Sequence, residues 1–242
     1  DVFKPIAPYQ IPYRVTIPEN IDGFMAAHKN ISVSHIVNGT TRLQPVTTSV
    51  GQAVGVAAAM ASNKGIEPRN IDVRELQEKL FDAKSNLFFF KDLPPDHFAY
   101  PYVGRLAVKG YISGYADFTF KPDDSINESD FLKILKVFLT YKNHDEELLN
   151  NVDLKDGSQV LVTRANMVEH MYNLLNSAAK IDTSNQEYLQ FTDIDKDSDL
   201  YDKLSRLVAI GVFSNSSNFR PNDYLTRAEA VTLSGRTFDI LF

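Results

Sequence analysis

The sequence predicts a mainly α-helical protein, in which a smaller α+β segment precedes a domain of helical repeats. The first observation is a duplication: the stretch that begins at Phe90-Lys91-Asp92 recurs from Phe191-Thr192-Asp193. The second is that each copy contains two helical patterns of apolar residues separated by a polar loop. Repeats of this kind are small units that cannot bury their apolar faces alone, so they pack on one another.

The composition places the chain among ordinary globular proteins, with 43% hydrophobic and 23% charged residues. Cysteine is absent, which excludes disulfides, and the five histidines form no zinc-binding pattern, so no metal site is predicted. No stretch has the roughly 18–20 uninterrupted apolar residues of a membrane span, and the start lacks a signal-peptide pattern. Two domains are predicted, at residues 1–86 and 87–242.

The charges are distributed unevenly between these parts. Residues 1–85 carry 9 basic and 8 acidic side chains, a balance of +1, whereas residues 86–242 carry 16 basic and 23 acidic side chains, a balance of −7. An acidic surface repels nucleic acid and anionic membranes at long range. Neither is therefore expected as a partner.

The first 85 residues are expected to combine short strands with two helices. Alternation at Ile11, Tyr13 and Val15 among several prolines favours extended chain, and residues 24–27 and 31–34 are predicted to be further strands. Small residues at positions 50–61 predict a helix with a hydroxyl N-cap at 47–49. That helix should end at Gly65, and a second should start at Asp72 with Glu75 completing a capping box.

The first of these helices is a candidate anion site. Gly51 and Gly55 would share one face near its start, where unpaired N–H groups suit phosphate or a flavin carbonyl. The alternative is close packing of the glycine face on a sheet, because this spacing alone is a weak signal.

The choice between an anion site and close packing is affected by a set of residues that match a known family pattern. These residues are Ile11-Pro12-Tyr13-Arg14, Ile31-Ser32, His35, Gly39, Arg42, Pro45, Gly51-Gln52-Ala53 and Gly55. With them, residues 11–85 resemble the C-terminal end of a family of FAD-dependent oxidoreductases, a group sometimes labelled xanthan lyases. The resemblance implies that Arg42, Gly51, Gln52 and Gly55 lie near the flavin when the nucleotide-binding half is present.

That half is missing from the sequence, since no GxGxxG motif follows a strand. We therefore expect this chain to bind no cofactor and to catalyse no redox reaction. The resemblance implies FAD as a cofactor only of a full-length parent protein. The chain is then either the C-terminal piece of a longer flavoprotein or a degenerate relict.

Each full copy of the duplication predicts a pair of helices. The first helices span 100–109 and 201–210 and end at Gly110 and Gly211, and the second helices start at Asn127 and Thr226. A truncated copy between them repeats the helix start at Thr163, and its own first helix is short, near 144–150, or absent. The repeats are predicted at residues 88–141, 142–180 and 188–242.

Matching positions in the copies include Phe90, Asp92, His97, Gly110, Gly114-Tyr115, Phe120 and Pro122, and in the last copy Thr226-Arg227-Ala228-Glu229. With them, residues 88–242 resemble S-layer homology (SLH) domains. The resemblance implies a three-pronged helical spindle with pseudo-threefold symmetry. It also implies a secreted or surface-bound bacterial protein, whose grooves hold anionic, often pyruvylated, cell-wall polysaccharide.

In that family the arginine of the Thr-Arg-Ala-Glu motif contacts the ligand, which implies that Arg164 and Arg227 bind glycan here. A guanidinium beside unpaired helix N–H groups suits a carboxylate or phosphate. The alternative is that both arginines only cap and bridge helices. The first copy has Glu128 at this position, so its groove should repel anions and that copy should chiefly build the spindle.

The predicted function is accordingly a non-catalytic surface-anchoring and glycan-binding module, with no catalytic residue. The alternative function is part of an FAD-dependent oxidoreductase whose nucleotide-binding half lies outside this chain.

Overall fold

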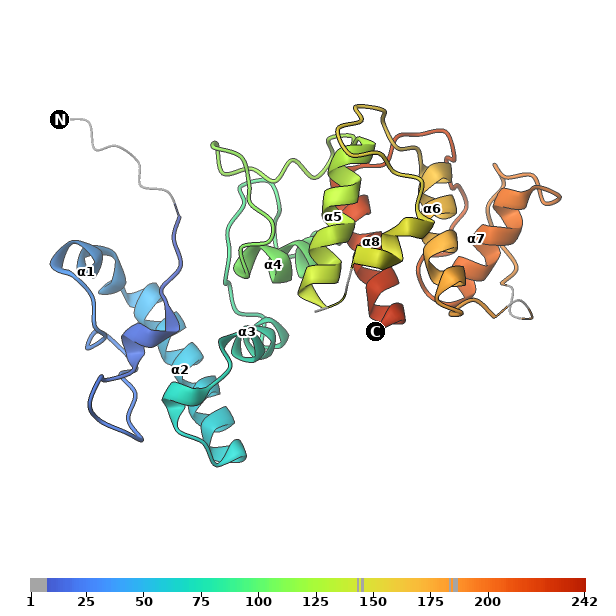
Figure 1. Ribbon diagram of the computed structural model, residues 1–242. Helices are drawn as coiled ribbons and strands as arrows, with labels where there is room; N and C mark the ends of the chain where they lie inside the picture. Colours follow the sequence, from blue (N-terminus) through green and yellow to red (C-terminus); the bar gives the residue numbers. More distant parts are fainter. Residues whose placement is uncertain (1–7, 143, 145, 183, 185–186) are drawn as a thin grey trace, which may run out of the picture. The chain divides into compact units, whose positions relative to one another are not determined.

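The structure is a computed structural model that describes residues 8–142, 144, 146–182, 184 and 187–242 (Figure 1). The chain forms two compact units, Asp1–Phe89 and Phe90–Phe242. Helices dominate the described part of both, and its extended pairing is limited to isolated bridges, so the mainly α class is confirmed. No helix among these residues is both long and apolar enough to span a bilayer.

The first unit is built around one long helix, α2 (Gln44–Lys64). The short α1 (His35–Thr41) precedes it, and α3 (Val73–Asp82) follows and packs on it. Their shared core contains Ala57, Met60, Ala61, Ile71, Leu76 and Leu80. Gly65 ends α2 in the left-handed conformation with φ of 61°, as predicted.

The opening of this unit has no strands within residues 8–89. Tyr13–Thr16 instead forms the 3-10 helix η1, and the Tyr13 hydroxyl donates to the Pro68 carbonyl at 2.9 Å. The Arg69 guanidinium holds the following loop by donating to carbonyl oxygens of residues 18, 19 and 21. The strands predicted around residues 11–15, 24–27 and 31–34 are therefore wrong.

Helix α2 also starts earlier than predicted, at Gln44 rather than near Val50. The Thr47 and Ser49 hydroxyls do not cap it, because they donate to carbonyl oxygens of the preceding turn at 2.9 and 3.1 Å. At α3 the Asp72 cap is confirmed, with its carboxylate accepting from the Arg74 N–H at 2.8 Å. The carboxylate of Glu75 forms an ion pair with Lys64.

The second unit has three central helices, α5 (Glu128–Tyr141), α6 (Arg164–Ser177) and α8 (Arg227–Leu241). Each begins after a predicted N-cap, whose side chain accepts from the N–H three residues later. These caps are Asn127, Thr163 and Thr226, at 2.8, 3.2 and 3.2 Å. Helix α8 contacts both α5 and α6, so the three second helices form the centre of the unit (Figure 1).

A closed ring of backbone hydrogen bonds joins the three copies just before these helices. The N–H of Ile126 donates to the Leu225 carbonyl at 2.9 Å, and that of Leu225 to the Val162 carbonyl at 2.8 Å. The N–H of Val162 closes the ring on the Ile126 carbonyl at 3.0 Å. All three residues are at most 1% exposed. This ring is the pseudo-threefold centre of the predicted spindle.

The outer helices interlace the copies. Helix α4 (Tyr100–Val108) of the first copy packs on α8 of the last, and α7 (Asp199–Ala209) of the last copy packs on α6 of the middle one. In the middle copy the short first helix is the 3-10 helix η3 (Glu146–Asn151), which contacts α5 and α6. The first helices of the two full copies therefore pack on a second helix of another copy, whereas η3 contacts α6 of its own copy as well as α5.

Helix α8 lies very close to α4 because it carries a glycine at the contact. A Cβ built on Gly235 would lie 2.1 Å from Cδ1 of the Tyr102 ring. The tyrosine ring thus fills the space that any side chain at position 235 would need.

Candidate functional site

An aspartate holds the polar loop of each full copy. The Asp92 carboxylate accepts from the N–H groups of Phe120 and Lys121 at 2.7 and 2.8 Å. Asp193 holds the loop of the last copy by the same pair of bonds, at 2.8 and 2.6 Å. Burial acts to raise the pKa of Asp193, but these N–H bonds, with the nearby charge of Arg164, leave it lowered.

Each predicted glycan-binding arginine is seated on the loop of another copy. Nε of Arg227 donates to the Phe120 carbonyl at 3.2 Å, and the guanidinium lies 5.0 Å from the centre of that phenyl ring. Arg164 is seated on Phe219 in the same way, with distances of 2.6 and 5.0 Å. Each arginine therefore lies between two copies, a neighbourhood that the duplication in the sequence does not reveal.

The backbone N–H groups beside these arginines are already bonded. At the start of α8, the N–H of Arg227 donates to the Asp124 carbonyl at 2.9 Å, and that of Ala228 to the Pro122 carbonyl at 3.0 Å. The N–H of Glu229 donates to the N-cap hydroxyl. The first turn of α6 is satisfied by the same pattern. The prediction that helix N–H groups assist in gripping an anion is therefore wrong, and the guanidinium must act without them.

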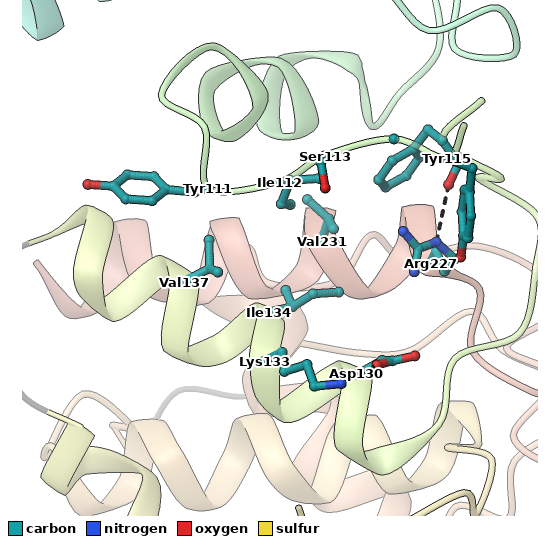
Figure 2. A pocket seen from close by; sticks show the side chains of 12 residues that line it. Tyr111, Ile112, Ser113, Tyr115, Asp130, Lys133, Ile134, Val137, Arg227 and Val231 are labelled. Atoms are coloured by element: carbon teal, nitrogen blue, oxygen red, sulfur yellow. Dashed lines mark hydrogen bonds and ion pairs between the residues drawn. The ribbon is translucent and has the colours of Figure 1, made fainter. Parts of the chain in front are cut away.

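Figure 2 shows the groove that contains Arg227. It has a volume of about 330 Å³ and lies between the loop of the first copy, α5 and α8. Ile134 and Val137 of α5 and Val231 of α8 form apolar walls, and the loop adds Tyr111 and Tyr115. The first copy does more than build the spindle, because its loop supplies one side of this groove.

The charges in this groove favour an anion. Its lining contains Arg227, Lys133 and Asp130, a balance of +1. Asp130 is bound by Lys133 at 2.9 Å, and no described residue gives Arg227 a carboxylate partner. The guanidinium instead lies 5.3 Å from the centre of the Tyr115 ring, which also receives the Lys121 ammonium at 4.3 Å.

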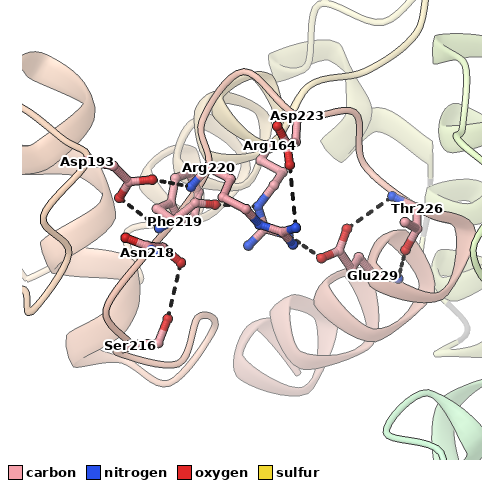
Figure 3. A network of polar contacts seen from close by, with 9 residues as sticks. All are labelled: Arg164, Asp193, Ser216, Asn218, Phe219, Arg220, Asp223, Thr226 and Glu229. Atoms are coloured by element: carbon pink, nitrogen blue, oxygen red, sulfur yellow. Dashed lines mark hydrogen bonds and ion pairs between the residues drawn. The ribbon is translucent and has the colours of Figure 1, made fainter.

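Arg164 differs from Arg227 in having a carboxylate partner, which Figure 3 shows. Its Nη1 pairs with Oε1 of Glu229, while the other oxygen of that carboxylate accepts from the Thr226 N–H at 3.1 Å. The side chains of Arg164 and Glu229 are only 16% and 21% exposed. The charge of Arg164 is thus neutralised by a residue of the chain itself.

The third position of the pseudo-threefold has Glu128 in place of arginine. The negative charges of Glu128, Asp153 and Glu169 act to raise the pKa of His170, a side chain that is 7% exposed. Burial lowers the pKa of His170 despite these carboxylates, and its Nδ1 has no hydrogen-bond partner in the described structure. This position therefore carries a carboxylate where the other two positions of the pseudo-threefold carry a guanidinium.

The four residues linked to a flavin lie at the end of α1 and along α2 of the first unit. Arg42 and Gln52 are exposed, and Gly51 and Gly55 lie well inside α2 rather than at its start. A Cβ on Gly51 would make van der Waals contact with the Ala27 carbonyl oxygen, at 3.4 Å. Because residues 8–89 contain no strand, this unit has no βαβ unit for a dinucleotide, and FAD does not fit it.

Comparison with protein families agrees with this division of the chain. The model of the FAD dependent oxidoreductase family matches residues 1–80, and the S-layer homology domain model matches residues 89–132 and 190–231. Both resemblances are confirmed. The two S-layer homology matches include the Tyr115 loop and the start of α8 with Arg227, and they indicate association with a cell surface. No curated protein matches the chain.

Proposed function

We propose that the second unit is a non-catalytic anchoring module of a secreted or surface-bound bacterial protein, which binds an anionic cell-wall polysaccharide at Arg227. One observation carries the proposal. The Arg227 guanidinium is fixed by the Phe120 carbonyl, lies in an open groove, and has no carboxylate partner among the described residues.

The lining of the groove matches the chemistry of an acidic sugar. A guanidinium binds a carboxylate through charge-assisted hydrogen bonds, worth about 1.5–3 kcal/mol each. Tyr111 and Tyr115 offer flat, partly apolar surfaces for a sugar ring, with hydroxyls at their edges. At about 330 Å³ the groove is at the small end of ligand sites, so it accommodates a short part of a long polysaccharide.

The positive lining also offsets the acidity of the rest of the unit. Residues 86–242 have a charge balance of −7, whereas the groove lining has a balance of +1. An acidic polymer is therefore attracted at the groove and repelled elsewhere, which favours one register of binding.

The match of residues 1–80 to the FAD dependent oxidoreductase family supports a second candidate function. In this alternative, the first unit completes an FAD-dependent enzyme whose nucleotide-binding part lies outside this chain. FAD is then a cofactor of that longer parent protein.

Binding to isolated cell walls tests the anchoring proposal. The protein should sediment with bacterial walls that retain their acidic polysaccharide, and should stay in solution with walls from which that polymer has been extracted. Binding should weaken steeply with salt, because it depends on charge. Equal sedimentation with both wall preparations, or none with either, would contradict the proposal.

A further inference from the structure

We propose that Glu229 closes the groove at Arg164, because its carboxylate occupies the place that a ligand carboxylate would take. The chain then binds one anionic ligand, at Arg227, and Glu229 determines this number. The inference rests on the proposed function of the Arg227 groove.

The two arginines have the same seat on a loop phenylalanine. Arg164 and Arg227 are each the first residue of a central helix, and each donates from Nε to the carbonyl of a loop phenylalanine. Each guanidinium lies 5.0 Å from the centre of that phenyl ring. Since the seats are the same, the difference in availability comes from the carboxylate opposite.

The carboxylates opposite the two arginines stand at equivalent helix positions but are bound differently. Asp130, beside Arg227, is one methylene shorter than Glu229 and is engaged by Lys133 at 2.9 Å and by Nδ2 of Asn127 at 3.3 Å. In α8 the position equivalent to Lys133 is Thr232, a buried residue that supplies no ammonium. Glu229 is therefore left to pair with Arg164.

The loop at the closed groove has also lost its ligand-facing features. It is two residues shorter than that of the first copy, and serine and asparagine fill positions 214–218, so the aromatic ring of Tyr115 has no counterpart. Asn215 is tied to the chain before it, donating to the Tyr188 carbonyl at 2.9 Å and accepting from the Gln190 N–H at 2.8 Å. The guanidinium of Arg236, which replaces Val137, donates to the Val212 carbonyl at 3.3 Å.

Glu229→Gln tests the closure with little damage to the helix start, since glutamine also serves in a capping box. The control is Asp223→Asn, which removes an exposed carboxylate from the same region that pairs with Arg220 and not with Arg164. The probe is an acidic, pyruvylated oligosaccharide purified from wall polysaccharide, and the readout is the number bound per chain by native mass spectrometry. Wild type and Asp223→Asn should bind one, and Glu229→Gln should bind two.

A second readout needs no ligand and separates this inference from the proposed function. Phenylglyoxal should modify Arg227 at least fivefold faster than Arg164 in the wild type, measured by peptide mass spectrometry, and Glu229→Gln should raise the rate at Arg164. Two oligosaccharides on the wild type, or one on Glu229→Gln with an unchanged rate at Arg164, would overturn the inference. If no variant binds the oligosaccharide, the proposed function fails and the modification rates alone decide the role of Glu229.

Discussion

The guanidinium of Arg227 lies 5.3 Å from the centre of the Tyr115 ring, although the two residues belong to the last and the first copies of the repeat. The groove between them therefore exists only when the chain closes its ring of hydrogen bonds through Ile126, Val162 and Leu225. Ligand binding and assembly of the spindle are consequently linked.

Substitution of the two loop-holding aspartates should distinguish effects on the stability of the second unit from effects on polysaccharide binding. In Asp92→Asn and in Asp193→Asn, one of two loop N–H groups loses its acceptor. We expect Asp92→Asn to destabilise the second unit by about 1–3 kcal/mol, because the N–H of buried Phe120 is affected. Chemical unfolding followed by circular dichroism measures this change.

The two variants should differ in binding to wall polysaccharide. Asp92→Asn loosens the loop that seats Arg227, so its affinity should fall several-fold. Asp193→Asn loosens the loop beside Arg164, which is already neutralised, and should bind as the wild type does. An equal loss of affinity in both variants would show that the two grooves contribute alike.

Gly235→Ala should destabilise the second unit. The added methyl would overlap the Tyr102 ring, at 2.1 Å from Cδ1, so α4 and α8 must separate. Overpacking of this kind typically costs about 1–3 kcal/mol, which the midpoint of chemical unfolding reports. The matched control is Gly55→Ala in α2, where no atom lies within 4 Å of the new methyl. The control should be neutral or stabilising, and equal destabilisation by both would refute the packing argument.

Stability of the second unit should decline in mild acid because of His170. Burial lowers the pKa of this side chain, whereas the unfolded chain takes up a proton near pH 6.5. Below about pH 6.5 the unfolded state therefore binds more protons than the folded state does. As a result, the free energy of unfolding falls as the pH decreases toward the pKa that His170 has in the folded protein. Above pH 6.5 this contribution is fully present.

Replacing the histidine tests that assignment. His170→Gln should flatten the dependence of the unfolding free energy on pH between about pH 7 and 5. His28→Gln, at an exposed position of the first unit, is the control and should leave the dependence of the second unit unchanged. A slope that survives in His170→Gln would assign the effect to other groups.

The purified chain should be colourless and should remain so after incubation with FAD and removal of excess cofactor. The reason is that residues 8–89 contain no strand with which to build a dinucleotide site, and the Gly51 face packs near the Ala27 carbonyl. The visible absorption of oxidised flavin measures retained cofactor. A stoichiometric yellow complex would contradict this expectation.

Much of the repeat fold is predictable from local sequence signals. Asn127, Thr163 and Thr226 mark helix starts because their side chains accept the first N–H groups, and Gly110 and Gly211 end helices because they take positive φ. The first unit is less predictable. Alternation at Ile11, Tyr13 and Val15 is compatible with a strand or with the observed turn of 3-10 helix, and a contact between Tyr13 and distant Pro68 stabilises the latter.

The candidate site was only half predictable for a physical reason. The resemblance to SLH domains points to Arg164 and Arg227 together, since both stand at the start of a second helix. Which of them is available depends on whether the carboxylate opposite is held by a lysine, as Asp130 is, or pairs with the arginine, as Glu229 does. These contacts cross between copies, and a duplication shows which residues correspond without showing which ones meet.

The affinity of Arg227→Ala and Arg164→Ala for wall polysaccharide tests the central claim most directly, with thermal unfolding used to confirm that each variant is folded. Losing a charge-assisted contact of about 1.5–3 kcal/mol should weaken binding by Arg227→Ala at least tenfold. Arg164→Ala should keep its affinity within about twofold, because that guanidinium is already paired with Glu229. Unchanged binding in Arg227→Ala, or a larger loss in Arg164→Ala, would contradict the account.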